Sequence, residues 1–342
     1  MTAGWNSAVQ TRGLLLAILW ALVALPAAHA QQPPPAEAPQ QGPPLKVSVN
    51  RVNVGVTVMD SSGRFVSGLT RNDFRVFDNG VEQPIADFLP VEEPAQVLLL
   101  IESGPAVLFF ARNHVLAADQ MLQSLAPDDR VAIVAYTKVP EPVMDFTTDK
   151  LAARQALFSM NFMQGFGELN LFSSVSTVVD WLSPVAGKKA IVLLSTGIDM
   201  STDVHWDTLR GKLETADVRI LAVSLSGDIR KPAKKRKLSA DDKANLAKLN
   251  EGFAQGDQAL RNLSDATGGH VYFVGNPGDF SKTYAHIAGL LRNEYSLAFA
   301  PAVLDGQLHT LRVEVKRGGV QVEHRPAYRA AVPAGAEPRQ QP

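Results

Sequence analysis

Five short, unbroken runs of β-forming apolar residues constrain the fold of this chain more than any other feature. They lie at 97–101, 131–136, 190–194, 220–225 and 271–274. Most are separated by segments whose apolar residues recur at helical spacing. Unbroken apolar runs are typical of strands that are buried on both faces of a parallel sheet. We therefore predict a doubly wound α/β domain with a mostly parallel sheet, at residues 95–293.

The segments on either side of this region, 45–94 and 294–331, follow a different pattern. Their apolar residues alternate with polar ones, as in strands with one buried face. The alternating residues are Val52, Val54, Val56 and Val58 in the first segment and Leu311, Val313 and Val315 in the second. Each segment is too small to cover its own sheet edges and apolar face. We predict that they combine into one small antiparallel β-sandwich-like module into which the α/β domain is inserted; the alternative is two separate β flaps on that domain.

The amino-terminal residues have the pattern of an export signal. Arg12 precedes an apolar run at 14–25, and Ala28-His29-Ala30 fits the small-x-small pattern of a signal peptidase site. The run is shorter than the roughly 20 residues that a membrane-spanning helix needs. We predict a signal peptide at 1–30 that is cut after Ala30, and a periplasmic or secreted mature protein. An uncleaved membrane anchor is the alternative.

Composition narrows the possible functions. The chain has no cysteine, so disulfides, thiolate nucleophiles and thiolate metal sites are excluded. A formal net charge of −1 gives no general attraction to nucleic acid. Residues 31–44 are rich in Pro and Gln, and 332–342 have a similar character, so both are predicted to be disordered. No stretch after the signal peptide has 18 consecutive apolar residues, and we expect no transmembrane segment there.

Several sequence features resemble one known family. The β segment contains Val56-Thr57-Val58-Met59-Asp60, Gly63, Val66, Gly68-Leu69-Thr70, Asp73-Phe74, Val76-Phe77 and Asp78-Asn79-Gly80, and a strand follows at 128–136. This order is similar to that of proteins with a von Willebrand factor A domain, and the β segment resembles the group of such proteins described from Acidobacteria. The resemblance covers about residues 47–330. It implies a Rossmann-like A-domain fold and a role in binding other proteins.

The resemblance also implies where a metal site would lie. In this family an Asp-x-Ser-x-Ser motif, a threonine and a second aspartate hold a divalent cation, which accepts a carboxylate from the partner protein. The matching positions here are Ile101, Ser103, Pro105, Leu169 and Thr196. Isoleucine, proline and leucine offer no side-chain oxygen to a hard cation. We therefore expect a degenerate site with no metal and no cofactor.

Two other groups of oxygen atoms offer an alternative, a cation-dependent adhesion domain that uses displaced acidic ligands. Glu102 lies beside the missing first aspartate, one residue out of register. An acidic cluster follows the third apolar run, at Asp199, Asp203, His205 and Asp207. The competing interpretation is that Asp203 or Thr202 caps the helix that carries Trp206.

Enzyme motifs are incomplete. Leu194-Ser195-Thr196-Gly197 matches half of a nucleophile elbow, but Leu193 stands where its first glycine belongs. Gly187-Lys188 is followed by Lys189 rather than by the Ser or Thr of a phosphate loop. We predict that the protein is not an enzyme, with a hydrolase of unrecognised site as a second alternative.

The sequence therefore predicts an exported, non-enzymatic protein-interaction or scaffolding protein whose partner is another extracytoplasmic protein. Partner contacts are expected beyond the carboxyl ends of the strands, at Glu102, Ser103, Phe166, Leu169, Thr196, Ile198 and Asp199. Six cations in a short basic segment are candidates for binding an anionic surface, the alternative being a solvated loop. They are Arg230, Lys231, Lys234, Lys235, Arg236 and Lys237.

Overall fold

The structure is a computed structural model that describes residues 51–104, 111–160, 162, 167–226, 239–274 and 278–332. All of them belong to one compact unit, Ser48–Pro342. The predicted signal peptide and spacer, nearly all of the predicted tail, Phe166 and the basic segment lie outside the described residues. Within the described part, no helix is both long and apolar enough to cross a bilayer.

The centre of the α/β domain is a six-stranded sheet with the strand order β10-β9-β8-β5-β6-β7. Its strands are β5 (Ala95–Glu102), β6 (Arg130–Tyr136), β7 (Pro140–Thr147), β8 (Lys188–Ser195), β9 (Arg219–Ser224) and β10 (Val271–Phe273). The five predicted apolar runs form the five parallel strands, while β7 pairs antiparallel with β6 at one edge. The predicted fold class is confirmed for this domain. Strand β7 was not predicted, because an edge strand with two prolines has no buried apolar run.

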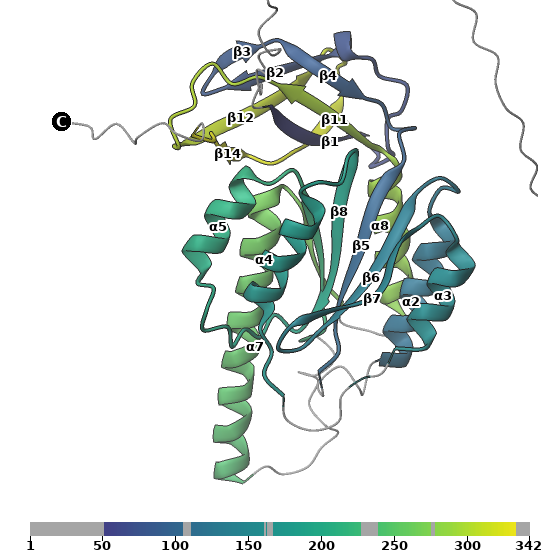
Figure 1. Ribbon diagram of the computed structural model, residues 1–342, viewed down its shortest axis with the longest axis vertical. Helices are drawn as coiled ribbons and strands as arrows, with labels where there is room; N and C mark the ends of the chain where they lie inside the picture. Colours follow the sequence, from purple (N-terminus) through teal and green to yellow (C-terminus); the bar gives the residue numbers. More distant parts are fainter. Residues whose placement is uncertain are drawn as a thin grey trace, which may run out of the picture. The chain divides into compact units, whose positions relative to one another are not determined.

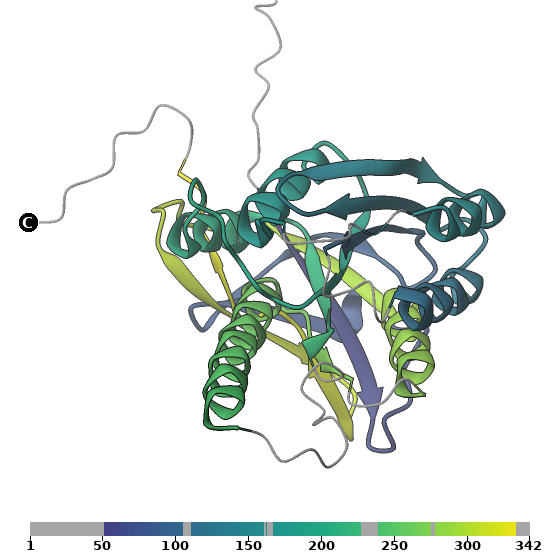
Figure 2. The same cartoon turned by 90° about the horizontal axis from the view of Figure 1, so that it is seen from below.

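Helices cover both faces of this sheet (Figures 1 and 2). One face carries α2 (Ala111–Ser124), α3 (Lys150–Phe158) and α8 (Asp279–Arg292), and the other carries α4 (Leu171–Leu182), α5 (Trp206–Thr215) and α7 (Ala240–Thr267). Alternate residues of each strand face opposite helix layers, so Leu99 and Ile101 pack in one core, and Leu98 and Leu100 in the other.

The β module consists of two four-stranded antiparallel sheets, β13-β1-β11-β4 and β14-β12-β2-β3. Its strands are β1 (Val52–Asp60), β2 (Phe74–Asp78), β3 (Val81–Gln83), β4 (Ile85–Leu89), β11 (Glu294–Phe299), β12 (Leu308–Val315), β13 (Val320–Glu323) and β14 (Ala327–Arg329), with a 3-10 turn, η1 (Arg71–Asp73), before β2. Strands from before and after the α/β domain pair with each other in both sheets and share one apolar core. The predicted sandwich-like module with an inserted α/β domain is therefore confirmed. A tight hairpin turn joins β2 to β3, with φ of 47° at Asn79 and 83° at Gly80.

The β module lies at the amino ends of the parallel strands (Figure 1). The Asn53 amide nitrogen donates to the Asp217 carboxylate at 2.7 Å, and Lys188 Nζ donates to the carbonyl oxygen of Glu294 at 3.2 Å. The carboxyl ends of the strands lie at the other end of the sheet. That end, which we call the sheet top, is the predicted location of the functional site.

Candidate functional site

Four side chains at the ends of β5, β6 and β8 form the sheet-top cluster: Glu102, Tyr136, Ser195 and Thr196. Oε2 of Glu102 accepts hydrogen bonds from the backbone N–H of Thr196 at 2.7 Å, from Thr196 Oγ1 at 2.8 Å and from Ser195 Oγ at 3.0 Å. The Tyr136 hydroxyl lies 2.6 Å from Ser195 Oγ. Oε2 of Glu102 therefore accepts hydrogen bonds from both Ser195 and Thr196, at the end of β8.

The sheet register brings these residues together. Glu102 pairs with Tyr136 across β5 and β6, and Ile101 pairs with Leu194 across β5 and β8. Glu102 therefore ends its strand beside both neighbours, on the same face as Leu100. Parallel pairing of three strands positions all four members of the cluster.

Close backbone packing closes the cluster on the side of α7. Gly197 has a φ of 77°, which favours glycine, and an added Cβ there would overlap the backbone of Gly256 on α7. Gly256 is equally constrained, because its added Cβ would lie 2.6 Å from the carbonyl oxygen of Thr196. The two glycines let the helix and the loop after β8 approach each other directly.

The sheet-top cluster is sealed from solvent. Glu102, Ser195 and Thr196 are each 0% exposed, and Tyr136 is buried as well. Burial raises the pKa of Glu102, while the hydrogen bonds from Thr196, Ser195 and Tyr136 oppose that rise. Burial, followed by the nearby Glu102 carboxyl group, raises the pKa of Tyr136. The Tyr136 hydroxyl also donates to Glu102 Oε2 at 3.4 Å.

Leu169 covers the cluster from the loop that precedes α4. Cδ2 of Leu169 would lie 2.8 Å from a Cβ added at Gly104. The carbonyl oxygen of Leu169 accepts a hydrogen bond from the N–H of Met200 at 2.7 Å. The loops that carry residues 102–104, 169 and 196–200 therefore meet, as predicted for the sheet top.

Burial separates the predicted contact residues into two groups. Glu102, Ser103, Leu169 and Thr196 are buried. Their side chains are not available for direct contact with a partner, which corrects the prediction that they form its surface. The reason is that Leu169 packs inward on Gly104, and the Glu102 carboxylate turns toward β8. Among the predicted residues that the structure describes, Ile198 and Asp199 remain half-buried.

The acidic cluster after β8 serves the amino terminus of α4. Oδ1 of Asp199 accepts from the N–H of Phe172 at 3.0 Å, and Ser173 Oγ bonds to Asp203. The prediction that Asp203 or Thr202 caps α5 is wrong, because His205 is the N-cap residue of that helix and makes no side-chain cap bond. Across the described residues, no three His, Asp or Glu side chains are grouped closely enough to hold a metal ion.

A groove opens beside the sheet-top cluster, between β6, β7 and the end of α3. Its volume is about 370 Å³. It is lined by Ser103, Ala135, Tyr136, Thr137, Val139, Glu141, Pro142, Val143, Ser159 and Met160. The groove could not be predicted from the sequence, because β7 lines it and was itself not predicted. The position of Tyr136, a residue with a hydroxyl at the end of an apolar run, was the available signal for the cluster itself.

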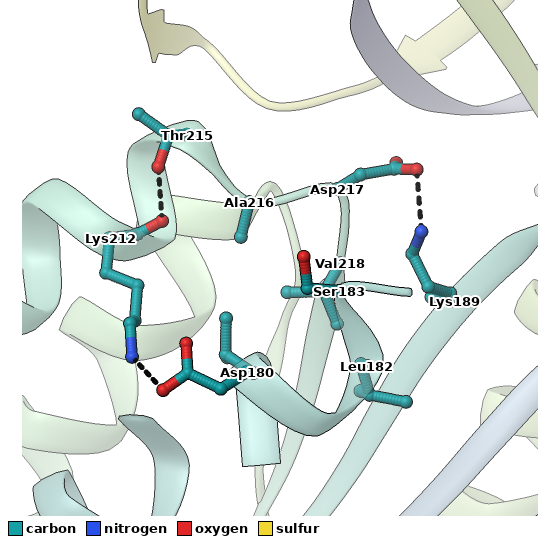
Figure 3. A pocket seen from close by; sticks show the side chains of 10 residues that line it. Asp180, Leu182, Ser183, Lys189, Lys212, Thr215, Ala216, Asp217 and Val218 are labelled. Atoms are coloured by element: carbon teal, nitrogen blue, oxygen red, sulfur yellow. Dashed lines mark hydrogen bonds and ion pairs between the residues drawn. The ribbon is translucent and has the colours of Figure 1, made fainter. Parts of the chain in front are cut away.

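A second groove, of about 400 Å³, lies at the other end of the α/β domain, between the carboxyl ends of α4 and α5 (Figure 3). Its charged side chains pair with each other: Lys212 lies 2.7 Å from Asp180, and Lys189 lies 3.1 Å from Asp217. Because these charges pair with each other, the described residues that line the groove present no unpaired charge for catalysis or ion binding.

Comparisons with known proteins add distant structural neighbours. No family model matches the chain, and no curated protein matches its sequence. Among solved structures, the chain is similar to a von Willebrand factor type A protein from Catenulispora acidiphila, with 11% identity, a TM-score of 0.41, and coverage of 84% of this chain and 75% of that one. The chain is also similar to the ArnB paralog VWA2 from Sulfolobus acidocaldarius, with 11% identity, a TM-score of 0.39, and coverage of 83% of this chain and 76% of that one. A third similar structure is the conserved hypothetical protein BatB from Bacteroides thetaiotaomicron, with 10% identity, a TM-score of 0.42, and coverage of 57% of this chain and 98% of that one.

Proposed function

We propose that this protein is an exported, non-enzymatic interaction or scaffolding protein, built on a von Willebrand factor A-like domain that works without a metal ion. One observation carries the proposal. The fully buried Glu102 carboxylate is bonded to Thr196 and Ser195, beside the positions where the resemblance places a cation and its ligands. The Glu102 carboxyl group accepts the hydrogen bonds from Thr196 and Ser195 at this position, and hydrocarbon side chains occupy two of the other ligand positions, at Ile101 and Leu169.

The hydrogen bonds of the buried cluster oppose cation binding. A divalent cation needs several oxygen ligands, whereas the Thr196 hydroxyl already donates to Glu102 and accepts from the N–H of Ile198 at 3.4 Å. Ser103, the surviving ligand position, donates its hydroxyl to the carbonyl oxygen of Tyr136 at 3.2 Å. Binding a divalent ion here would require breaking these bonds inside a sealed site. Recognition of a partner would therefore use side-chain contacts.

The groove beside the cluster is the surface that we assign to the partner. Val139 on its rim is 54% exposed, and Val143 and Met160 add apolar lining. Ile198 and the exposed Met200 extend the accessible apolar area at the sheet top. An apolar groove with a few polar groups fits a short apolar segment of another extracytoplasmic protein.

Burial of Ser195 supports a non-enzymatic role. A nucleophilic serine needs access to substrate and a general base, usually a histidine. Ser195 is 0% exposed, and its hydrogen-bond partners in the described structure are Glu102, Tyr136 and the N–H of Gly197. These contacts give the Ser195 hydroxyl a structural role.

Two matched variants test the partner surface. Val139→Asp places a charge in the groove, and Val303→Asp places the same charge at a site of the β module with almost equal exposure, 53%. In affinity capture from envelope extracts, we expect Val139→Asp to capture at least tenfold less of the specific partner than the wild type. Val303→Asp should capture as much as the wild type. Loss of capture in EDTA, restored by Mg²⁺, would overturn the metal-independent mechanism.

Direct metal titration tests the same point without a partner. Calorimetry with Mg²⁺, Ca²⁺ and Mn²⁺ should show no stoichiometric binding to the wild-type protein. Binding of one Mn²⁺ that Glu102→Gln or Thr196→Val abolishes would support the cation-dependent adhesion domain instead.

The basic segment adds a separate proposal for an anionic surface, which rests on its six cations. If it acts in this way, binding to anionic lipid vesicles should fall steeply with salt and disappear when all six become Ser or Gln. Vesicle binding that does not depend on salt would remove this proposal and leave the partner groove unaffected.

A further inference from the structure

The partner groove, which lies between β6, β7 and the end of α3, combines an exposed carboxylate with an apolar lining. Helix α3 packs on both strands (Figure 1). Ala135 and Glu141 pair across β6 and β7, so their side chains share one face of the sheet, and both residues line the groove. Glu141 is exposed, and Val143 and Met160 belong to the same lining. The carboxylate is therefore the charged group that a segment bound in the groove would meet.

Glu141 has no ion-pair partner in the described part of the chain. The cations of the neighbouring segments are each bonded elsewhere: Lys138 to Glu168 at 2.9 Å, Arg154 to Asp119, and Lys150 Nζ to the carbonyl oxygen of Asp129 at 2.6 Å. Because these cations are occupied, the negative charge of Glu141 remains available to a bound group.

The carboxyl end of α3 adds negative potential to the same groove. Ser159, the C-cap residue of α3, and Met160 both line it. The carbonyl groups in the last turn of a helix carry partial negative charge, which basic side chains often offset. Helix α3 has no basic residue in its last turn. The Ser159 hydroxyl donates to the carbonyl oxygen of Ala156 at 2.8 Å, so toward the groove its oxygen can only accept.

Two prolines remove donors from the open edge of β7. The carbonyl oxygen of Tyr136 accepts from the N–H of Ser103 on the β5 side, at 2.9 Å. Tyr136 and its cross-strand partner Pro140 therefore form a pair without hydrogen bonds, and the backbone of Pro140 faces away from β6. Pro142 lies two residues further on and has the same orientation. Proline has no N–H, so the edge offers carbonyl oxygens and no donor at both positions.

We propose that the partner groove recognises a basic residue, lysine or arginine, within the apolar segment that it binds. This inference rests on the proposed function, because it takes the groove to be the partner surface. The cationic group of the partner pairs with Glu141 beside the carboxyl end of α3, and the flanking apolar residues contact Val139, Val143 and Met160.

The polar atoms of the groove explain why a basic residue fits. Lysine and arginine side chains supply several N–H donors and need only acceptors in return. Regular strand addition is opposed at Pro140 and Pro142, because an added strand would find no backbone donors there. Recognition therefore depends on the side chains of the bound segment, and the charge of Glu141 selects among them.

Peptide display tests this chemistry directly. A library of short random peptides is selected against the predicted mature chain, both as wild type and as the charge reversal Glu141→Arg. Binding to Val139→Asp then identifies the peptides that need the groove. Among those peptides, the wild type should enrich apolar sequences that contain Lys or Arg. Glu141→Arg should enrich apolar sequences that contain Asp or Glu instead.

One enriched basic peptide then serves as the probe for calorimetry. Glu141→Gln keeps the size of the side chain and removes its charge, and it should weaken binding of the probe about fivefold. Asp145→Asn is the matched control, because Asp145 is an exposed carboxylate of the same strand outside the groove lining; it should bind the probe as the wild type does. In about 0.5 M salt, the difference between wild type and Glu141→Gln should shrink. All variants should keep the Tm of the wild type, since the altered side chains are exposed.

The outcomes separate this inference from the proposed function. Groove-dependent peptides without enrichment of Lys or Arg would overturn the basic-residue requirement and leave the partner groove in place. Equal affinities of wild type and Glu141→Gln for the probe would do the same. A selection that yields no peptide sensitive to Val139→Asp would show that the groove is not the partner surface, and both proposals would then fail.

Discussion

The two ends of the parallel sheet solve the problem of buried charge in opposite ways. At the sheet top, one buried carboxyl side chain, Glu102, is surrounded by neutral donors from Ser195 and Thr196. At the amino ends, several cations meet, and Arg219 and Arg325 each keep one buried donor without a hydrogen-bond partner among the described residues. The first end satisfies its carboxyl group with hydrogen bonds, whereas the second pairs cations with carboxylates, as Arg219 does with Glu294.

This difference indicates how each end is held. Hydrogen bonds from neutral donors hold Glu102 at the sheet top, whereas ion pairs and bonds to backbone oxygens hold the cations at the amino ends. The position of charge relative to its partners, rather than the amount of buried charge, separates the two ends.

The largest expected effect on the free energy of unfolding is at the amino ends of the parallel strands, where the β module meets the α/β domain. Arg219→Met leaves the buried Glu294 carboxylate without its ion pair, and Thr57 and Gly268 without their donor. We expect the free energy of unfolding to fall by about 3–5 kcal/mol, measured by urea denaturation. The double variant Arg219→Met with Glu294→Gln should recover part of this loss. A loss below about 1 kcal/mol would show that the ion pair does not hold the junction together.

Removing the Glu102 acceptor at the sheet top should lower the free energy of unfolding by a somewhat smaller amount. Glu102→Leu keeps a similar side-chain volume but leaves the N–H and hydroxyl of Thr196 and the hydroxyl of Ser195 unpaired in a buried site. We expect a loss of about 2–4 kcal/mol in the same denaturation experiment. Glu102→Gln, which keeps one acceptor oxygen, is the matched control and should lose less than half as much. Equal losses in both variants would contradict the role of Oε2 as the common acceptor.

The pH dependence of stability sharpens the same comparison. Burial raises the folded-state pKa of Glu102 above its ordinary value of 4.5. The folded protein therefore holds this proton more tightly than the unfolded chain does. The resulting stabilisation is complete below pH 4.5 and is lost as the pH rises through the folded pKa. Relative to Glu102→Gln, the wild type should lose about 1.4 kcal/mol for each pH unit across that interval. A wild-type advantage that grows with pH would mean that the hydrogen bonds outweigh burial.

The smallest effect is expected for an exposed ion pair at the sheet top. Lys138 Nζ lies 2.9 Å from Glu168, and the two side chains are 68% and 54% exposed. Lys138→Met should change the free energy of unfolding by less than about 0.5 kcal/mol, and the change should shrink further at 1 M salt. A larger change in thermal unfolding would show that solvated charges at this end matter as much as the buried ones at the junction.

Much of the fold was predictable because hydrophobic patterning is a local property of the chain. Unbroken apolar runs identified the parallel strands, and alternating valines identified β1. The convergence of three loops at the sheet top followed from strand direction alone. Edge strand β7 was missed because its prolines and polar residues leave no such pattern.

The sequence by itself determined the fold class, the pairing of the two flanking β segments in one module, and the absence of thiol chemistry. Only the tertiary structure decided where the charges lie. It turned Glu102 inward onto Thr196, used Asp199 to cap α4, and brought Arg325 from the end of the chain to Arg219 near the start of β9. Such placements depend on contacts between residues far apart in the sequence, whereas periodicity reports only which face of a strand or helix is buried.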